Sequence, residues 1–316
     1  MSLKSRVERE AVSAVRGDAP VGRLPPSRPV RTFTVLLAVT AAALGATSGS
    51  SLARSVTSPC GTKKTTAYAH VVVIVMENHA YSKIIGSSDA PFENSLAREC
   101  GQATSYYAIT HPSLPNYIAL TAGTTAGITD DKRPSQHQLT DASIFSQEGS
   151  SWRSYEESMP STCDLSSSGL YAVKHNPAPY FTNVRTACST QDVPLPSSPS
   201  FTASYTFVTP NLCNDMHDCS VATGDNWLKA FVPKVLRSRE YKNGKLVLFL
   251  TWDEGGGASG INHVPLIVVG PTVPAGLSIS TKYTHYGLLR TVEELLQKAC
   301  LADACTATSL RTAFHL

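Results

Sequence analysis

The sequence lacks the short motifs that mark several large classes of enzyme. It contains no G-x-S-x-G nucleophile turn, no G-x-x-x-x-G-K-[ST] phosphate loop and no H-E-x-x-H zinc helix. It also has no Cys-x-x-Cys pair, which argues against a structural zinc site. None of these local motifs therefore identifies an active site in this chain.

The chain also lacks an apolar run long enough to span a bilayer comfortably. The apolar run at residues 33–46 is shorter than the roughly 20 residues that a spanning helix needs. Arginines precede it and small residues follow it, which is typical of a secretory signal. We expect cleavage after Ala53, with Ser48 as the alternative site and an uncleaved N-terminal membrane anchor as the alternative fate. Residues 1–53 are then a signal segment, and residues 54–316 form one secreted, extracellular domain with no stable membrane span.

The domain that remains has no excess of basic residues. The whole chain has 27 Lys and Arg against 24 Asp and Glu, but residues 1–53 alone hold seven against three. Its positive charge therefore belongs to the signal segment, and the composition implies no nucleic-acid partner.

All eight cysteines follow the signal segment. An even number of cysteines in an exported chain favours disulfides, although the sequence does not prove which cysteines pair. Proximity in the chain suggests three bonds and leaves the fourth by remainder: Cys163–Cys188, Cys213–Cys219, Cys300–Cys305 and Cys60–Cys100.

Apolar, β-branched segments are predicted to form strands buried on both faces of a parallel sheet. Three of them cover residues 70–76, 205–210 and 245–252. Glu77 and Asn78 follow the first strand directly, and Asp253 and Glu254 follow the third. A carboxylate at a strand end can hold a metal, and an amide there can contact a phosphate; a merely polar strand end is the alternative.

Polar residues also follow the second of these strands. Asn211 comes first, and Asn214, Asp215, His217 and Asp218 then lie between two cysteines. Carboxylate and imidazole groups suit a divalent metal or a general acid. A surface turn is the alternative interpretation.

A hydroxyl lies between two prolines in residues 110–116, Thr-His-Pro-Ser-Leu-Pro-Asn. Each proline disfavours helical backbone at the residue before it, so His111 and Leu114 are predicted to be extended. A helix is predicted over residues 118–123, ending at a glycine. Ser113 would then lie just before a helix, where free N–H groups gather phosphate oxygens, or it would serve only as a capping serine.

The long segment at residues 158–200 is rich in Pro, Ser and Thr and is predicted to be a loop region. A loop region of this length in a compact domain is usually functional or tied down. Lys174 and His175 within it could contact a substrate phosphate or headgroup, or they could be ordinary solvated residues.

In a parallel sheet the three strand ends would share one edge. Acidic residues gathered at one edge repel one another unless cations lie among them. Together with the serine turn, this pattern favours a metal-assisted phosphoryl site more than any single motif does.

With these motifs the chain resembles the bacterial phosphoesterase family, which groups acid phosphatases and phospholipase C-type enzymes within the alkaline-phosphatase superfamily. The resemblance begins with residues 70–123 and continues through Asn-Asp-x-His-Asp at residues 214–218 and Asp-Glu at residues 253–254. It implies an α/β fold, a three-layer α/β/α sandwich with a mostly parallel central sheet. It also implies a phosphomonoesterase that works through a phosphoserine, with phosphate monoesters, including phosphoinositide headgroups, as substrates.

The resemblance also implies roles for individual residues, with Ser113 as the nucleophile. The candidate catalytic residues are Ser113, Asn116, His217 and His285. The candidate substrate-binding residues are Asn78, His111, Lys174 and His175. The candidate ligands of a divalent metal are Glu77, Asn211, Asp215, Asp253 and Glu254. The second metal-binding motif of the superfamily is incomplete here, so the identity and number of the ions stay open.

Two other functions remain open from the sequence. A phosphodiesterase of the phospholipase C type would use the same nucleophile with a pocket for a second ester group. A non-catalytic exported protein would use the acidic edge only to hold a structural cation.

Overall fold

The structure is a computed structural model that describes residues 58–64, 67–257 and 261–316. The predicted signal segment, residues 1–53, lies outside the described residues. Within the described part of the chain, no helix combines the length and the apolar character needed to cross a membrane.

A central eight-stranded sheet has the order β5-β4-β6-β1-β7-β8-β2-β9. The strands from β5 to β7 are parallel, β8 runs antiparallel to both β7 and β2, and β9 is parallel to β2. The predicted mostly parallel sheet is thus confirmed. The strands are β1 (His70–Met76), β2 (Gly101–Ala103), β4 (Trp152–Glu156), β5 (Asp192–Pro194), β6 (Tyr205–Thr209), β7 (Leu246–Trp252), β8 (Leu266–Val269) and β9 (Leu277–Ile279), with β3 (Tyr106–Tyr107) and β10 (Tyr283–Thr284) in a separate pair.

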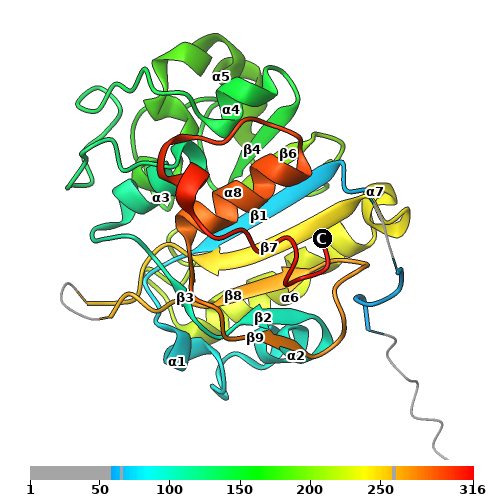
Figure 1. The fold of residues 1–316 in the computed structure, drawn as a ribbon. Coiled ribbons are helices and arrows are strands. Elements are labelled where there is room, and N and C mark those ends of the chain that lie inside the picture. The colour runs from blue at the N-terminus through cyan, green and yellow to red at the C-terminus, as the bar shows by residue number, and fades with distance from the viewer. Residues whose placement is uncertain (1–57, 65–66, 258–260) are drawn as a thin grey trace, which may run out of the picture. The chain divides into compact units, whose positions relative to one another are not determined.

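Helices cover both faces of this sheet, which gives the predicted three layers (Figure 1). Helix α8 packs with α3 in front of the sheet in this view, and α6 packs with α2 on the other side. The α-helices are α1 (Tyr81–Ile84), α2 (Pro91–Glu99), α3 (Ser113–Ala122), α4 (Ile144–Glu148), α5 (Arg185–Gln191), α6 (Val221–Leu236), α7 (Arg239–Lys242) and α8 (His285–Leu295). Short 3₁₀ helices cover Val173–His175, Ala178–Tyr180, Thr182–Val184 and Ala302–Thr306.

The register of the central strands brings the predicted strand ends together. β1 lies between β6 and β7, with Ile74 opposite Val208 and Met76 opposite Trp252. All three strands are buried along their length, as their β-branched and aromatic residues predict. The polar residues that follow them therefore leave the sheet at the same side, which we call the carboxyl edge.

The serine turn differs from its prediction. Helix α3 begins at Ser113 rather than at residue 118, so Leu114 is helical and not extended. Pro115 is tolerated because it lies in the first turn, where a backbone N–H has no partner within the helix. The helix ends as predicted at Gly123, whose φ of 70° is left-handed.

All four predicted disulfides are present. They join Cys60 to Cys100, Cys163 to Cys188, Cys213 to Cys219 and Cys300 to Cys305. The Cys213–Cys219 bond closes the polar loop that follows β6, so that this loop is held at the carboxyl edge.

A buried carboxyl pair between α2 and α6 makes stability depend on pH. Asp225 Oδ1 accepts hydrogen bonds from the N–H groups of Phe92 and Glu93, at 2.9 and 3.0 Å. The Glu93 side chain is fully buried, and burial together with the neighbouring Asp225 raises the pKa of Glu93 to about 10. Because the folded state binds this proton more tightly, stability is full below the unfolded pKa and falls as pH rises toward 10.

We therefore expect Glu93→Gln to raise the thermal midpoint at pH 8 by several degrees and to leave it nearly unchanged at pH 4.5. A change of about 1 kcal/mol shifts the midpoint of a domain of this size by roughly 2–4 °C. Thermal unfolding at both pH values measures the effect, with Glu99→Gln on the same helix as the control. An equal shift at the two pH values would contradict the assignment.

Candidate active site

Ser113 is the first residue of α3 and is buried at the carboxyl edge of the sheet. Its hydroxyl donates a hydrogen bond of 3.1 Å to Glu77 Oε2. Glu77 is the residue that follows β1, and its side chain is fully buried. The predicted nucleophile and a predicted metal ligand, 36 residues apart in the chain, are therefore in direct contact.

The Glu77 carboxylate is the centre of this cluster. Asn78 Nδ2 donates to the same oxygen, Oε2, at 3.1 Å, and the Tyr117 hydroxyl donates to Oε1. Burial, and then the charges of Asp253 and Asp215, raise the pKa of Glu77 well above its ordinary range. A cation bound beside Glu77 would offset the free-energy cost of keeping this buried carboxylate charged.

Asp253 and Glu254 follow β7 beside Glu77. Asp253 Oδ1 accepts the backbone N–H of Asn78 at 3.0 Å, while the buried Oδ2 has no hydrogen-bond partner. Burial, and then the charge of Glu254, raise the pKa of Asp253 to about 7, and the nearby Ser113 hydroxyl partly offsets this rise. Burial and the charge of Asp131 raise the pKa of Glu254 to about 7.

A second group contains two imidazoles, His175 from the loop region and His217 from the loop that follows β6. His175 lies buried between Glu77 Oε1 and Asp215 Oδ2, at 3.3 Å from each. Burial, and then the charge of Lys174, hold the pKa of His175 well below its ordinary value, so the ring is neutral. One ligand atom each from Glu77, His175 and His217 lies within 4.8 Å of the others.

These donors fit a divalent cation. The buried oxygen Asp253 Oδ2 has no hydrogen-bond partner, and the 3.3 Å contacts of His175 with Asp215 Oδ2 and Glu77 Oε1 do not have hydrogen-bond geometry. Carboxylate oxygens and neutral imidazole are ligands that divalent metals accept, and unpaired buried carboxylates are costly without a counter-charge. The predicted ligands Glu77, Asp215, Asp253 and Glu254 all belong to this region, and His175 and His217 join them.

Asn211 does not join the cluster in this way. Its amide oxygen accepts the backbone N–H groups of Cys213 and Asn214, at 3.1 and 3.0 Å, and its Nδ2 donates to Ser158. The side chain therefore stabilises the loop after β6, and both acceptor positions of its amide oxygen are used by the backbone instead of by a metal.

The hydrogen-bonding groups of Asn116 and His285, two of the predicted catalytic residues, all have partners within the protein. Asn116 Oδ1 accepts from the N–H groups of Ile109 and Thr110, and its Nδ2 donates to two carbonyl oxygens of the same turn. The buried His285 ring contacts the Asp253 carbonyl oxygen at 2.6 Å and the Tyr106 hydroxyl at 2.8 Å. Burial lowers the pKa of His285 to about 4, so its neutral ring donates to that carbonyl and positions Asp253.

The remaining predicted residues, His111, Lys174 and His217, are partly exposed beside this cluster. His111 Nδ1 lies 2.5 Å from Glu254 Oε2. His217 is partly exposed, with Nδ1 at 2.6 Å from Asp218 Oδ1 and Nε2 at 3.4 Å from Lys174 Nζ. Lys174 Nζ also donates to Asp131 Oδ2 at 3.1 Å.

The sequence interpretation missed two residues of the site. Tyr117 lies four residues after Ser113, and a helix starting at Ser113 would have placed both on one face. Asp131 comes from the connection between α3 and α4 and carries no comparable signal, because nothing in its local sequence pattern shows that it folds back onto the start of α3.

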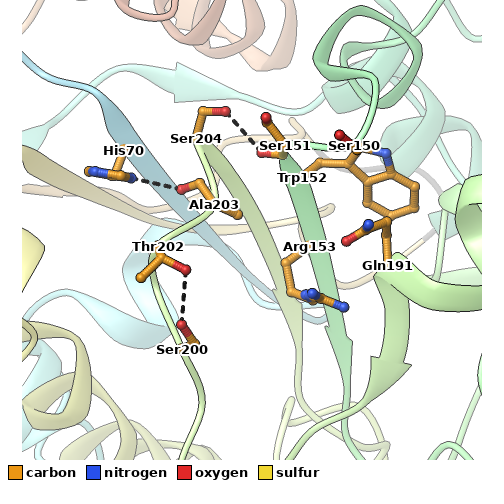
Figure 2. A pocket seen from close by; sticks show the side chains of 10 residues that line it. All are labelled: His70, Ser150, Ser151, Trp152, Arg153, Gln191, Ser200, Thr202, Ala203 and Ser204. Atoms are coloured by element: carbon orange, nitrogen blue, oxygen red, sulfur yellow. Dashed lines mark hydrogen bonds between the residues drawn. The ribbon is translucent and has the colours of Figure 1, made fainter.

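Two pockets lie at opposite ends of the strands. The pocket in Figure 2, about 380 Å³, is lined by His70, Trp152 and Ser204 at the amino ends of β1, β4 and β6 and is therefore far from the carboxyl edge. A second pocket, of about 470 Å³, lies at the carboxyl edge, and Asn78 is part of its wall. Asn78 and Ser113 both donate hydrogen bonds to Glu77 Oε2, so this pocket adjoins the cluster.

Comparison with known proteins identifies related sequences. Residues 87–297 match the profile of the Phosphoesterase family. The chain is 36% identical over 233 residues to a phosphatidylinositol-3-phosphatase of Mycobacterium tuberculosis, covering 72% of this chain and 77% of that protein. It is 33% identical over 256 residues to a phosphate-repressible acid phosphatase of Penicillium chrysogenum, covering 73% of this chain but only 60% of that protein.

Solved structures show the same fold at low sequence identity. A lipoteichoic acid synthase of Listeria monocytogenes matches with a TM-score of 0.54 and 10% identity over 77% of each chain. A member of the alkaline phosphatase superfamily from Vibrio parahaemolyticus matches with a TM-score of 0.50 and 11% identity, over 78% of this chain and 72% of that one. The predicted alkaline-phosphatase-like architecture is confirmed, and the match to the family profile together with the mycobacterial relative shows that the chain belongs to the phosphoesterase family.

Proposed function

We propose that this protein is an exported hydrolase of phosphoric monoesters that works through a phosphoserine at Ser113. The observation that carries the proposal is the contact between the buried Ser113 hydroxyl and Glu77, beside Asp253 and Glu254. The names of the relatives, a phosphatidylinositol-3-phosphatase and acid phosphatases, support the same class of substrate.

The chemistry follows from where the groups lie. Ser113 Oγ attacks phosphorus in line and forms a phosphoserine, while its proton passes to Glu77 Oε2, the acceptor 3.1 Å away. The ester P–O bond breaks, and the partly exposed His217 gives a proton to the departing alcohol oxygen. Water then cleaves the phosphoserine. A divalent cation held by Glu77, Asp253 and Glu254 would neutralise phosphate charge and favour the ionised hydroxyl.

A phosphate-release screen tests the function directly. We expect the protein to hydrolyse p-nitrophenyl phosphate, to lose activity with a chelator and to regain it with a divalent metal. Faster cleavage of bis(p-nitrophenyl) phosphate than of the monoester would identify a phosphodiesterase instead. Bound metal without turnover of either ester would identify a binding protein.

Export is part of the proposal. The signal pattern in residues 1–53 and the four disulfides both support an oxidising compartment. The N-terminal sequence of the mature protein recovered from the medium tests it, and a chain that starts at Met1 and stays in the cytoplasm would contradict it.

The pocket beside Asn78 is the place for the alcohol part of the substrate. Its wall includes Ala80, Val221 and Lys83, and the Lys83 ammonium group makes no hydrogen bond or ion pair with any described residue. The positive charge of Lys83, in the same pocket wall as Asn78, suits a substrate whose alcohol carries a second negative group, as phosphoinositide headgroups do.

We expect Lys83→Ala to raise KM for an inositol bisphosphate by about twofold to fivefold, because one exposed charge contact is lost. KM for p-nitrophenyl phosphate, which has no second charge, should not change. Steady-state kinetics on both substrates measure this, with the distant Lys242→Ala as the control. Equal changes for both substrates would remove Lys83 from recognition of the alcohol.

A further inference from the structure

The Asp131 carboxylate accepts hydrogen bonds from two donors near the start of α3. Asp131 Oδ1 accepts the backbone N–H of Leu114, the residue that follows Ser113, at 3.0 Å. Asp131 Oδ2 accepts from Lys174 Nζ at 3.1 Å. One carboxylate therefore links a backbone N–H in the first turn of α3, which has no partner within the helix, to the partly exposed Lys174.

These are the donors that a phosphate group at Ser113 needs. An attacking hydroxyl must have phosphorus next to it, so the non-bridging oxygens must lie within reach of nearby N–H groups and cations. Ser113 also lies beside the carboxylates Glu77, Asp253 and Glu254, which repel an anion. The Asp131 carboxylate adds one more negative group beside the start of α3.

Asp131 is able to leave. Its side chain is about 29% exposed, and it belongs to the connection between Ala122 and Ile144, which forms no helix and no named strand. Its partner Lys174 is also partly exposed, and Lys174 Nζ has a second neighbour in His217 Nε2 at 3.4 Å. The contact can therefore break without opening the core.

We propose that Asp131 sets the affinity of this enzyme for phosphate by competing for the same donors. In the free protein its carboxylate holds Leu114 N–H and Lys174 Nζ, and the phosphate oxygens of substrate or product displace it. This inference rests on the proposed function, because it concerns the same site. A different role would be purely positioning, in which Asp131 holds Lys174 in the orientation that phosphate requires.

The two roles predict opposite changes in phosphate affinity. If Asp131 competes, Asp131→Asn and Asp131→Ala lower the Ki of inorganic phosphate against p-nitrophenyl phosphate by about tenfold, since a like charge is removed from the site. If Asp131 only positions Lys174, both variants raise Ki. Asp130→Asn is the matched control, because Asp130 pairs with Lys132 and His137 instead, and its Ki should stay unchanged.

The test uses the full-length mature protein loaded with metal, with thermal midpoints to confirm that each variant is folded. Isothermal titration with inorganic phosphate gives a Kd that does not depend on turnover. Lys174→Met should weaken phosphate binding more in the Asp131→Asn background than in the wild type, because the variant frees Lys174. An unchanged or raised Ki in both Asp131 variants of an active enzyme overturns this inference alone, whereas failure to hydrolyse any monoester overturns the proposed function.

Discussion

Ser113→Ala is expected to lower kcat for p-nitrophenyl phosphate by about six orders of magnitude, the scale seen when a hydrolase loses its nucleophilic serine. The hydroxyl is the only group removed, and the Glu77 carboxylate that accepts its hydrogen bond keeps Asn78 and Tyr117 as donors. The fold should therefore survive, and KM should change little because the phosphate donors remain. Burst and steady-state kinetics on the metal-loaded protein measure the loss.

Ser82→Ala is a suitable control for this variant, since Ser82 lies on the exposed part of α1 and takes no part in the cluster. We expect it to keep wild-type activity. Activity of Ser113→Ala within a few-fold of wild type would mean that another group, or water, attacks phosphorus.

Asp253→Asn should abolish most activity and yet stabilise the metal-free protein. In the wild type, burial raises the pKa of Asp253 to about 7. The free energy of unfolding therefore falls as pH rises from the unfolded pKa of this group toward 7, and the full loss of stability is present at pH 8. Asparagine has no charge, and its oxygen can still accept the N–H of Asn78. With chelator at pH 8 we expect a gain of roughly 2 kcal/mol, and little gain at pH 4.

Activity should fall about a hundredfold to a thousandfold in the same variant, because a ligand for the cation and its charge balance are lost. Added metal should then raise the thermal midpoint of the wild type but hardly that of Asp253→Asn. Unfolding curves with and without chelator at pH 4 and pH 8 measure this, with the exposed Asp141→Asn as the control. A variant that is less stable without metal and still active would contradict the account of the carboxyl edge.

The edge that carries the site could be predicted because its signals are local. Runs of β-branched residues end abruptly at Glu77 and at Asp253, and a buried parallel sheet must bring such ends to one side. Even the disulfides followed from proximity in the chain, since three of the four close short segments.

The roles of single side chains could not be predicted in the same way. Asn116 and His285 have the right chemistry for a substrate contact, but the turn before α3 and the carbonyl of Asp253 use all their hydrogen-bonding groups. Which partner a polar group finds depends on tertiary distances, and the local sequence does not contain them.

The position of Asp131 could not be predicted from the local sequence either. The connection between α3 and α4 has no hydrophobic period that would place it, yet it folds back and places a carboxylate on the first turn of α3. The early start of α3 has a local cause, since a proline is harmless in a first turn, and it could have been recognised.

The steric course at phosphorus tests the central claim most directly, because every active enzyme gives one of two answers. Transfer of an isotopically chiral phosphoryl group to an acceptor alcohol should proceed with net retention, since attack by Ser113 and release from the phosphoserine are two in-line displacements that each invert phosphorus. Net inversion would show a single direct attack on the substrate, and Ser113 would then not be the nucleophile.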